Sequence, residues 1–190
     1  ISVMRDTFWQ TIDQWSTGTD ESAMFHQYVP NHKDMLAECI AYNGYNDQSS
    51  NSIGRERKEF VWSKEKNAFV ETDHIHRYFA TPTKDHFPVI CEFLESNQHQ
   101  YFNSQISMIK PGGVIIPHVH NREQWLFNMS LNFPNECRFA VYPTGLIPYR
   151  AGDVYKLRVE NFHSVINESD TDRYHIMMRT KETMQSWGRL

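Results

Sequence analysis

The segment PGGVIIPHVH, residues 111–120, combines a glycine turn with an apolar, extended run that ends in two histidines. Side chains alternate between the two faces of a β-strand, so His118 and His120 are expected to point the same way. Two imidazoles that face a barrel interior are poorly satisfied without a ligand or a metal. Because imidazole nitrogen binds Fe, Zn and Cu, the segment predicts part of a metal site. The plain alternative is an edge strand with two solvated histidines.

A second segment, NFHSVIN at residues 161–167, follows a glycine turn at Gly152. Its histidine, His163, begins an apolar run of the kind that forms a buried strand. A lone histidine is more often an ordinary core or loop residue than a ligand. Together with the earlier histidine pair, however, His163 is favoured as a metal ligand. We expect His163 to lie on a strand that faces the first segment across a barrel.

The region from residue 101 onward consists of short β-rich segments, most of them separated by turn residues. Short strands at this spacing are typical of a jelly-roll or a related double-sheet barrel. The expected fold is therefore mainly β with N-terminal helices, a double-stranded β-helix (jelly-roll, cupin-like) barrel. The expected strands are residues 104–109, 114–116, 124–132, 138–142, 146–149, 154–157, 164–166 and 174–180.

Residues 1–100 carry a different pattern. Apolar residues recur at helical spacing in residues 6–15, 34–42 and 88–97, and residues 60–70 predict a β-hairpin with a polar turn. Glu38 falls outside the apolar stripe of the second helix and is expected to face water. We expect residues 1–100 to be a helical and mixed extension that packs on the barrel, and residues 101–190 to be the metal-binding core of one compact unit.

Composition limits the classes of function. The chain has 190 residues, a formal net charge of −4 and no basic run, so nucleic acid is not expected as a partner. No apolar run reaches the roughly 18 residues of a membrane span, and the N-terminal residues lack a signal-peptide pattern. Three widely spaced cysteines suit a reducing compartment, so the expected location is the cytoplasm.

The order of these elements resembles the aspartyl/asparaginyl β-hydroxylase family, whose members are Fe(II)- and 2-oxoglutarate-dependent oxygenases with a double-stranded β-helix fold. The resemblance covers roughly residues 104–180, and its most specific part is the order S-x3-PG, PH and H-x9-R. It implies a dioxygenase that uses O2 to hydroxylate a small-molecule or peptide substrate, amino-acid-like or peptidyl. The residues that carry it are Ser107, Pro111-Gly112, Pro117-His118, Leu131 to Pro134, Gly152, His163, Asn167 and Arg173.

Carried onto this chain, the resemblance implies that His118 and His163 bind the iron. It implies that Arg173 binds the distal carboxylate of 2-oxoglutarate and that Ser107 hydrogen-bonds the same cosubstrate. Asn128 stands where the family usually has a histidine near the cosubstrate.

Two features depart from the family pattern. The family's additional arginine just before Asn128 is replaced by QWLF at residues 124–127, which leaves open how a second carboxylate is held. Many related oxygenases place an acidic residue two positions after the first histidine, where this chain has His120. His120 is therefore a third metal ligand, a group that supports a ligand, or a spectator. Glu123 is a further candidate for the metal.

Two other classes of protein stay open. A metal cupin that does not use 2-oxoglutarate would bind its metal through His118, His120, Glu123 and His163, and would be a dioxygenase, isomerase or lyase. Such a protein would not need Arg173 to face the metal. A non-enzymatic barrel that binds a small molecule would hold no stoichiometric metal.

The remaining histidines carry weaker signals. His74 and His76 form a second H-x-H pattern, but no glycine turn precedes it and no partner histidine follows at barrel spacing. The sequence indicates neither the oligomeric state nor which compound is the substrate. The histidines expected at the surface or on helices are His26, His32, His86, His99 and His175.

Overall fold

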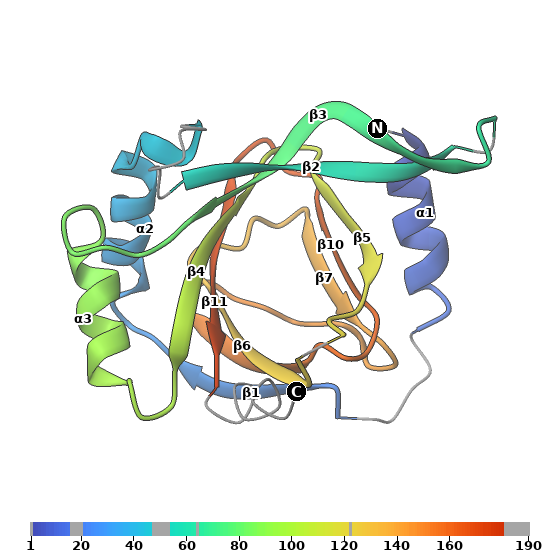
Figure 1. The fold of residues 1–190 in the computed structure, drawn as a ribbon. Coiled ribbons are helices and arrows are strands. Elements are labelled where there is room, and N and C mark those ends of the chain that lie inside the picture. Colours follow the sequence, from blue (N-terminus) through green and yellow to red (C-terminus); the bar gives the residue numbers. More distant parts are fainter. Residues whose placement is uncertain (1, 16–20, 47–53, 64, 122, 181–190) are drawn as a thin grey trace.

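The computed structural model describes residues 2–15, 21–46, 54–63, 65–121 and 123–180. Its strands form two antiparallel sheets that close around a common interior (Figure 1). The large sheet has the order β1-β9-β6-β11-β4-β3-β2, and the small sheet has the order β5-β10-β7-β8. The predicted fold, a mainly β double-sheet barrel with N-terminal helices, is confirmed.

The elements alternate between helix and strand only in the first half of the chain. The helices are α1 (Ser2–Ile12), α2 (His32–Ala41) and α3 (Pro88–Ser96), with a 3-10 turn η1 (Gly44–Asn46). None of the helices among the described residues is long and apolar enough to cross a membrane. The strands are β1 (Ala23–Tyr28), β2 (Gly54–Ser63), β3 (Ala68–Ala80), β4 (Phe102–Ile109), β5 (Val114–His118), β6 (Trp125–Ser130), β7 (Cys137–Val141), β8 (Gly145–Leu146), β9 (Asp153–Arg158), β10 (His163–Asn167) and β11 (Arg173–Arg179).

The expected elements match these bounds closely. Each of the eight strands predicted beyond residue 101 corresponds to one of β4 to β11. The predicted hairpin is the turn between β2 and β3, where Trp62 pairs with Phe69. The second and third predicted helices are α2 and α3, whereas α1 begins and ends earlier than the predicted range of residues 6–15.

The large sheet separates two apolar cores. Its outward face packs with α2 and α3 through side chains such as Ile106 and Ile176. Its inward face packs on the small sheet through side chains such as Ile109 and Leu157. Because side chains alternate along a strand, β11 sends Ile176 to the outer core and its neighbour His175 into the barrel.

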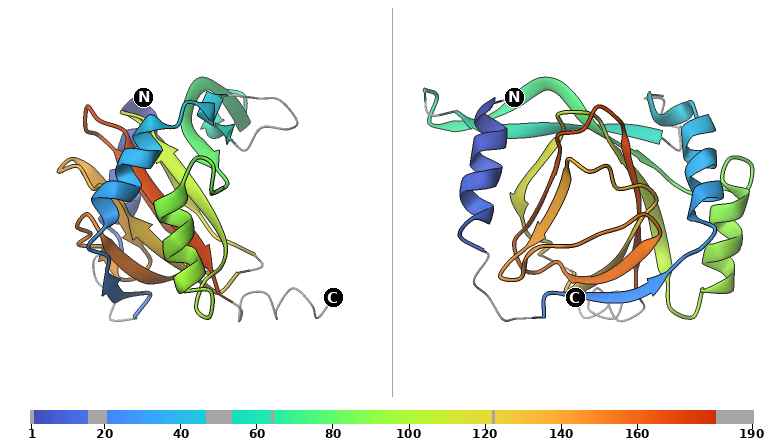
Figure 2. Two further views of the ribbon diagram at one scale, coloured as in Figure 1. Left: turned by 90° about the vertical axis from the view of Figure 1, so that its left-hand side faces the viewer. Right: turned by 180° about the vertical axis from the view of Figure 1, so that it is seen from behind.

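The first 100 residues both cover the barrel and extend it. Helix α1 buries Phe8 and Ile12 against the small sheet, on the opposite side of the molecule from α2 and α3 (Figures 1 and 2). Strand β1 pairs with β9, and β3 pairs with β4, so strands from this region flank the large sheet on both sides. The pairing of Arg77 with Ile109 brings this region to the barrel interior.

Glu38 joins α2 to α3 and is half-buried, so the expectation that it faces water was wrong for its carboxylate, which is engaged by α3. Its carboxylate accepts hydrogen bonds from the backbone N–H groups of Val89 (2.6 Å) and Ile90 (3.1 Å). These groups lie in the first turn of α3, whose N-cap residue Phe87 makes no side-chain cap. A carboxylate satisfies such N–H groups and complements the positive end of the helix dipole, which explains its half-buried position.

Candidate metal and carboxylate site

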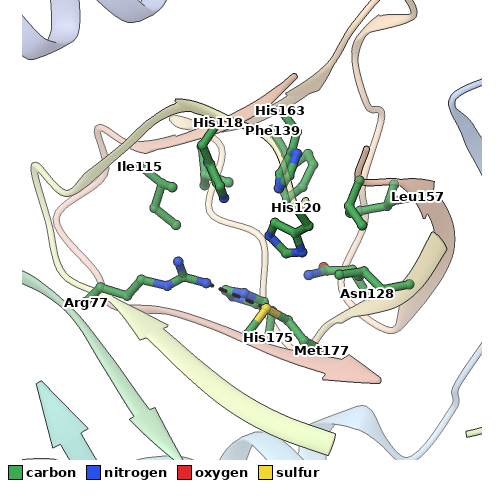
Figure 3. A pocket seen from close by; sticks show the side chains of 13 residues that line it. Arg77, Ile115, His118, His120, Asn128, Phe139, Leu157, His163, His175 and Met177 are labelled. Carbon is green, nitrogen blue, oxygen red and sulfur yellow. Dashed lines mark hydrogen bonds between the residues drawn. The ribbon is translucent and has the colours of Figure 1, made fainter. Parts of the chain in front are cut away.

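Three histidines meet at one end of the barrel interior (Figure 3). His118 ends β5 and pairs directly with His163, which begins β10, while His120 lies two residues beyond β5. The ring centroids are 4.2 Å apart for His118 and His163, and 4.9 Å apart for His120 and His163. One ring nitrogen from each lies within 4.8 Å of the other two, so a single metal ion could contact all three.

The Nδ1 atom of each ring faces a hydrogen-bond acceptor. For His118 and His163 the acceptor is the backbone carbonyl two residues earlier, at 2.9 Å and 3.0 Å. For His120 it is the Glu123 carboxylate, at 2.8 Å. A neutral imidazole that donates from Nδ1 carries its lone pair on Nε2. Nε2 is therefore the ligand atom that each ring offers, as is usual for metal-binding histidines with an orienting acceptor.

His163 is held in the form that binds metals. Burial lowers the pKa of His163 well below its usual value, and the neighbouring His118 adds to the shift. A neutral ring at physiological pH has a lone pair to donate, because metal binding requires a deprotonated ligand atom.

Glu123 contacts the His120 ring on its Nδ1 side. It does not lie beside the Nε2 atoms that the three histidines offer to a metal. One carboxylate oxygen accepts from His120, and the other accepts from Nε of Arg179, the last residue of β11. Burial alone would raise the pKa of Glu123, but the hydrogen bonds from His120 and Arg179 and the charge of Arg179 hold that pKa below its ordinary value. In this structure both carboxylate oxygens of Glu123 are therefore engaged by His120 and Arg179.

Arg173 is a fully buried cation inside the barrel. Its guanidinium carbon lies 5.4 Å, 5.7 Å and 6.0 Å from the ring centroids of Phe133, Phe139 and Tyr149. Its Nη1 contacts Nδ1 of His175 at 3.0 Å, while Nε and Nη2 have no hydrogen-bond partner among the described residues. An uncompensated buried charge is costly, and the edge formed by Nε and Nη2 matches a carboxylate in geometry.

Arg77, which the sequence did not single out, lines the same interior as the histidines (Figure 3). Arg77 on β3 and Arg173 on β11 pair with Ile109 from opposite sides. The Arg77 guanidinium donates to Ser107 Oγ at 3.0 Å and contacts Met177 Sδ at 3.6 Å. The Arg77 side chain therefore lies against β11, in the wall of the pocket that the three histidines also line.

His175 also lines the pocket, so the prediction that it lies at the surface or on a helix was wrong. It is 2% exposed, because inward positions on β11 recur every second residue from Arg173. Burial, followed by the charges of Arg173 and Arg77, lowers the pKa of His175 well below its usual value. The neutral ring accepts from Arg173 at Nδ1 and therefore carries its own proton on Nε2.

Ser107 and Asn128 both lie in the barrel interior. Ser107 is fully buried on β4, where its hydroxyl receives the hydrogen bond from Arg77. Asn128 on β6 lines the pocket, and its Oδ1 accepts from the Tyr149 hydroxyl at 3.1 Å. Among the described residues that line the pocket none is acidic, which favours an anionic ligand.

Asn167 acts on the backbone that leads to Arg173. Its amide donates to the carbonyl oxygens of Ile109 (3.0 Å) and Thr171 (2.8 Å), and its own oxygen accepts from Ser169. These bonds fix the turn between β10 and β11. The other H-x-H pattern lies in β3, and the side chains of His74 and His76 are not among those described.

Comparison with known families places this chain among 2-oxoglutarate-dependent oxygenases. Residues 27–183 match the family described as Aspartyl/Asparaginyl beta-hydroxylase. The chain belongs to the aspartyl/asparaginyl β-hydroxylase family. The match begins well before residue 104, so the region that contains Arg77 is also part of the family's sequence pattern. A search of curated proteins gave no match.

Several solved structures share the fold. One is an oxidoreductase of the 2OG-Fe(II) oxygenase family from Burkholderia pseudomallei, with 14% identity over 92% of this chain and 89% of that one, at a TM-score of 0.51. Another is AviO1 from Streptomyces viridochromogenes Tue57, with 13% identity over 90% and 92% of the two chains and a TM-score of 0.57. A third is SnoK, a non-heme alpha ketoglutarate dependent carbocyclase from nogalamycin biosynthesis, with 12% identity over 89% and 82% and a TM-score of 0.54. At these identities the likeness concerns the fold alone.

Proposed function

We propose that this chain is an Fe(II)- and 2-oxoglutarate-dependent hydroxylase that acts on an amino-acid-like or peptidyl substrate. The family supplies the class of reaction, and its description supports the substrate class. The observation that carries the proposal is the pairing, in one barrel interior, of a three-histidine cluster with a buried arginine that lacks a partner on two nitrogens.

The histidine cluster suits Fe(II). His118 and His163 are its principal ligands in this proposal, and His120 offers a third nitrogen within reach. Neutral imidazole is a common ligand of non-heme iron, and a set of three protein ligands leaves positions for a bidentate cosubstrate and O2. The backbone carbonyls that accept from His118 and His163 orient both rings.

Arg173 suits the distal carboxylate of 2-oxoglutarate. Its Nε and Nη2 would donate to the two carboxylate oxygens, and the surrounding rings exclude water, which strengthens the pair. Arg77 adds a second positive charge in the pocket that the three histidines line, and in this proposal it replaces the arginine that the family carries before Asn128. Ser107 contributes by holding Arg77 in place.

The positions of these residues indicate what each of them would contribute to the reaction. When bound, Fe(II) and 2-oxoglutarate supply the oxidising chemistry, in which O2 and the 2-oxo acid yield succinate, CO2 and a hydroxylated substrate. The arginines would orient the cosubstrate, and the apolar lining from Ile115, Leu126 and Leu157 keeps water out.

An anaerobic titration of the Fe(II)-loaded protein with 2-oxoglutarate tests the proposal. Chelation of iron by a 2-oxo acid gives a visible charge-transfer band, which we expect for the wild type and for the exposed-residue control His99→Ala. We expect His163→Ala to lose the band together with iron. A metal cupin that ignores 2-oxoglutarate would retain iron and show no band, and that result would overturn the proposal.

A further inference from the structure

Glu123 and Arg179 form a partly buried ion pair on the Nδ1 side of His120. The side chain of Glu123 is 6% exposed and that of Arg179 is 21% exposed. Each Glu123 oxygen has its own donor, one from the His120 ring and one from Arg179 Nε. Moving Glu123 onto a metal would break both contacts and leave the Arg179 charge without its partner.

His120 needs such support because no strand holds it. His118 and His163 lie on β5 and β10, and each ring donates to a carbonyl of its own strand or its lead-in, two residues earlier. His120 lies beyond the end of β5, where its backbone N–H donates to Val159. The carboxylate of Glu123 thus does for the loop histidine what backbone carbonyls do for the other two.

We propose that Glu123, held by Arg179, positions His120 as a third metal ligand, so that the centre has three neutral imidazoles and no carboxylate. Glu123 and Arg179 are positioning residues in this arrangement. The inference rests on the proposed function only in requiring that a metal binds to His118 and His163. His120 is then a ligand and neither a supporting group nor a spectator, and Glu123 lies outside the ligand set.

The ligand set has an electrostatic consequence for the site. Three neutral imidazoles leave the full double positive charge of the ion in a pocket whose described lining has no acidic residue. The Glu123 charge is balanced by Arg179 and does not reduce it. Such a centre attracts carboxylate-bearing ligands more strongly than one that already holds an aspartate or a glutamate.

Ring-nitrogen NMR of the full chain, titrated with Zn(II) as a diamagnetic probe, tests the inference without turnover. We expect the Nε2 signals of His118, His120 and His163 to shift together up to one equivalent, with His120 protonated on Nδ1. The buried His175 is the internal control and should not change. Shifts of His118 and His163 without His120 would overturn the third ligand alone, whereas no shift of any of them would contradict the proposed metal site as well.

Variants separate the positioning role from direct ligation. We expect Glu123→Ala to weaken Zn(II) binding about 10–100-fold, as loss of an orienting group does, and to abolish the His120 shift while His118 and His163 still respond. Arg179→Met should also weaken Zn(II) binding, and Arg179→Lys, which keeps the charge, should weaken it less. Glu92→Ala on the exposed face of α3 is the matched control. Glu123→Ala with wild-type affinity, or with a loss as complete as that of His163→Ala, would overturn the positioning role.

Discussion

Arg173 is a cation surrounded by aromatic rings. Its burial costs free energy while it is unpaired, and a bound carboxylate would reduce that cost. Its guanidinium lies among three aromatic rings, and two of its nitrogens have no partner among the described residues. The sequence indicated this residue through its spacing from His163. An arginine at that position, pointing into the barrel, was expected to be a buried cation in need of a carboxylate, but the aromatic rings around it could not be predicted, because they come from distant parts of the chain.

Replacement of Arg173 by Met separates binding from stability. We expect 2-oxoglutarate affinity to fall about 10–100-fold, because the variant loses hydrogen bonds to a charged group. We expect the ligand-free variant to melt at the same or a higher temperature, because an apolar side chain replaces an uncompensated buried charge. Calorimetric titration and thermal melts measure the two effects. Unchanged affinity with a lower melting temperature would show that Arg173 is a structural residue.

The Arg77 guanidinium should contribute to the same carboxylate recognition. We expect Arg77→Gln to weaken 2-oxoglutarate binding about tenfold, and Arg77→Lys to recover only part, because lysine keeps the charge but not the planar fork. Titration of the metal-loaded variants measures both. Equal affinities for all three proteins would remove Arg77 from the site.

His175 links stability to pH. Its pKa is lowered in the folded protein by burial and by Arg173 and Arg77, while in the unfolded chain it titrates near about 6.5. Below that pH the unfolded chain binds a proton that the folded protein does not, so the free energy of unfolding falls as the pH falls. We expect His175→Gln to reduce this dependence below pH 6.5 by up to about 1.4 kcal/mol per pH unit.

Denaturant unfolding at a series of pH values measures the dependence. The exposed His99→Gln variant is the control and should keep the wild-type slope. A His175→Gln slope that equals the wild-type slope would mean that the folded protein protonates His175 as readily as the unfolded chain does.

At the scale of elements, the strands beyond residue 101 were predictable because turn residues bound most of them. Strand β1 was not, since its sequence AMFHQY shows no clear alternation and its residues are only half-buried or exposed. The role of β3 also escaped prediction, because its pairing with β4 joins segments far apart in the chain. Arg77 was missed for that reason. The inward position of His175 could have been predicted, because it lies two residues after Arg173 on the same strand.

The contact between α2 and α3 gives a test at this scale. We expect Glu38→Ala to lower the free energy of unfolding by about 1–2 kcal/mol, the usual effect of losing a helix cap, because Val89 and Ile90 lose their acceptor. Hydrogen exchange should accelerate in the first turn of α3. The Glu38→Gln variant, which keeps one acceptor oxygen, should have a stability and an exchange rate between those of the wild type and Glu38→Ala. A wild-type exchange rate in Glu38→Ala would contradict the capping role.

At the scale of the whole molecule, the fold brings cations and imidazoles from both halves of the chain into one interior. The small sheet and the loop after β5 supply the histidines, and the large sheet supplies Arg173, His175 and, through β3, Arg77. The sequence predicted the metal half of this arrangement because its residues lie in compact motifs. The rest depends on strand order and on side chains that meet only in the folded barrel.

The central claim is that one site binds both iron and 2-oxoglutarate, and succinate formation tests it most directly. The protein is supplied with Fe(II), O2, 2-oxoglutarate and a panel of amino acids and short peptides, and succinate is measured for the wild type, Arg173→Met and His163→Ala. We expect succinate from the wild type and little or none from either variant at the same 2-oxoglutarate concentration. Succinate formation by Arg173→Met at the wild-type rate, or none from wild-type protein that has bound its iron, would contradict the claim.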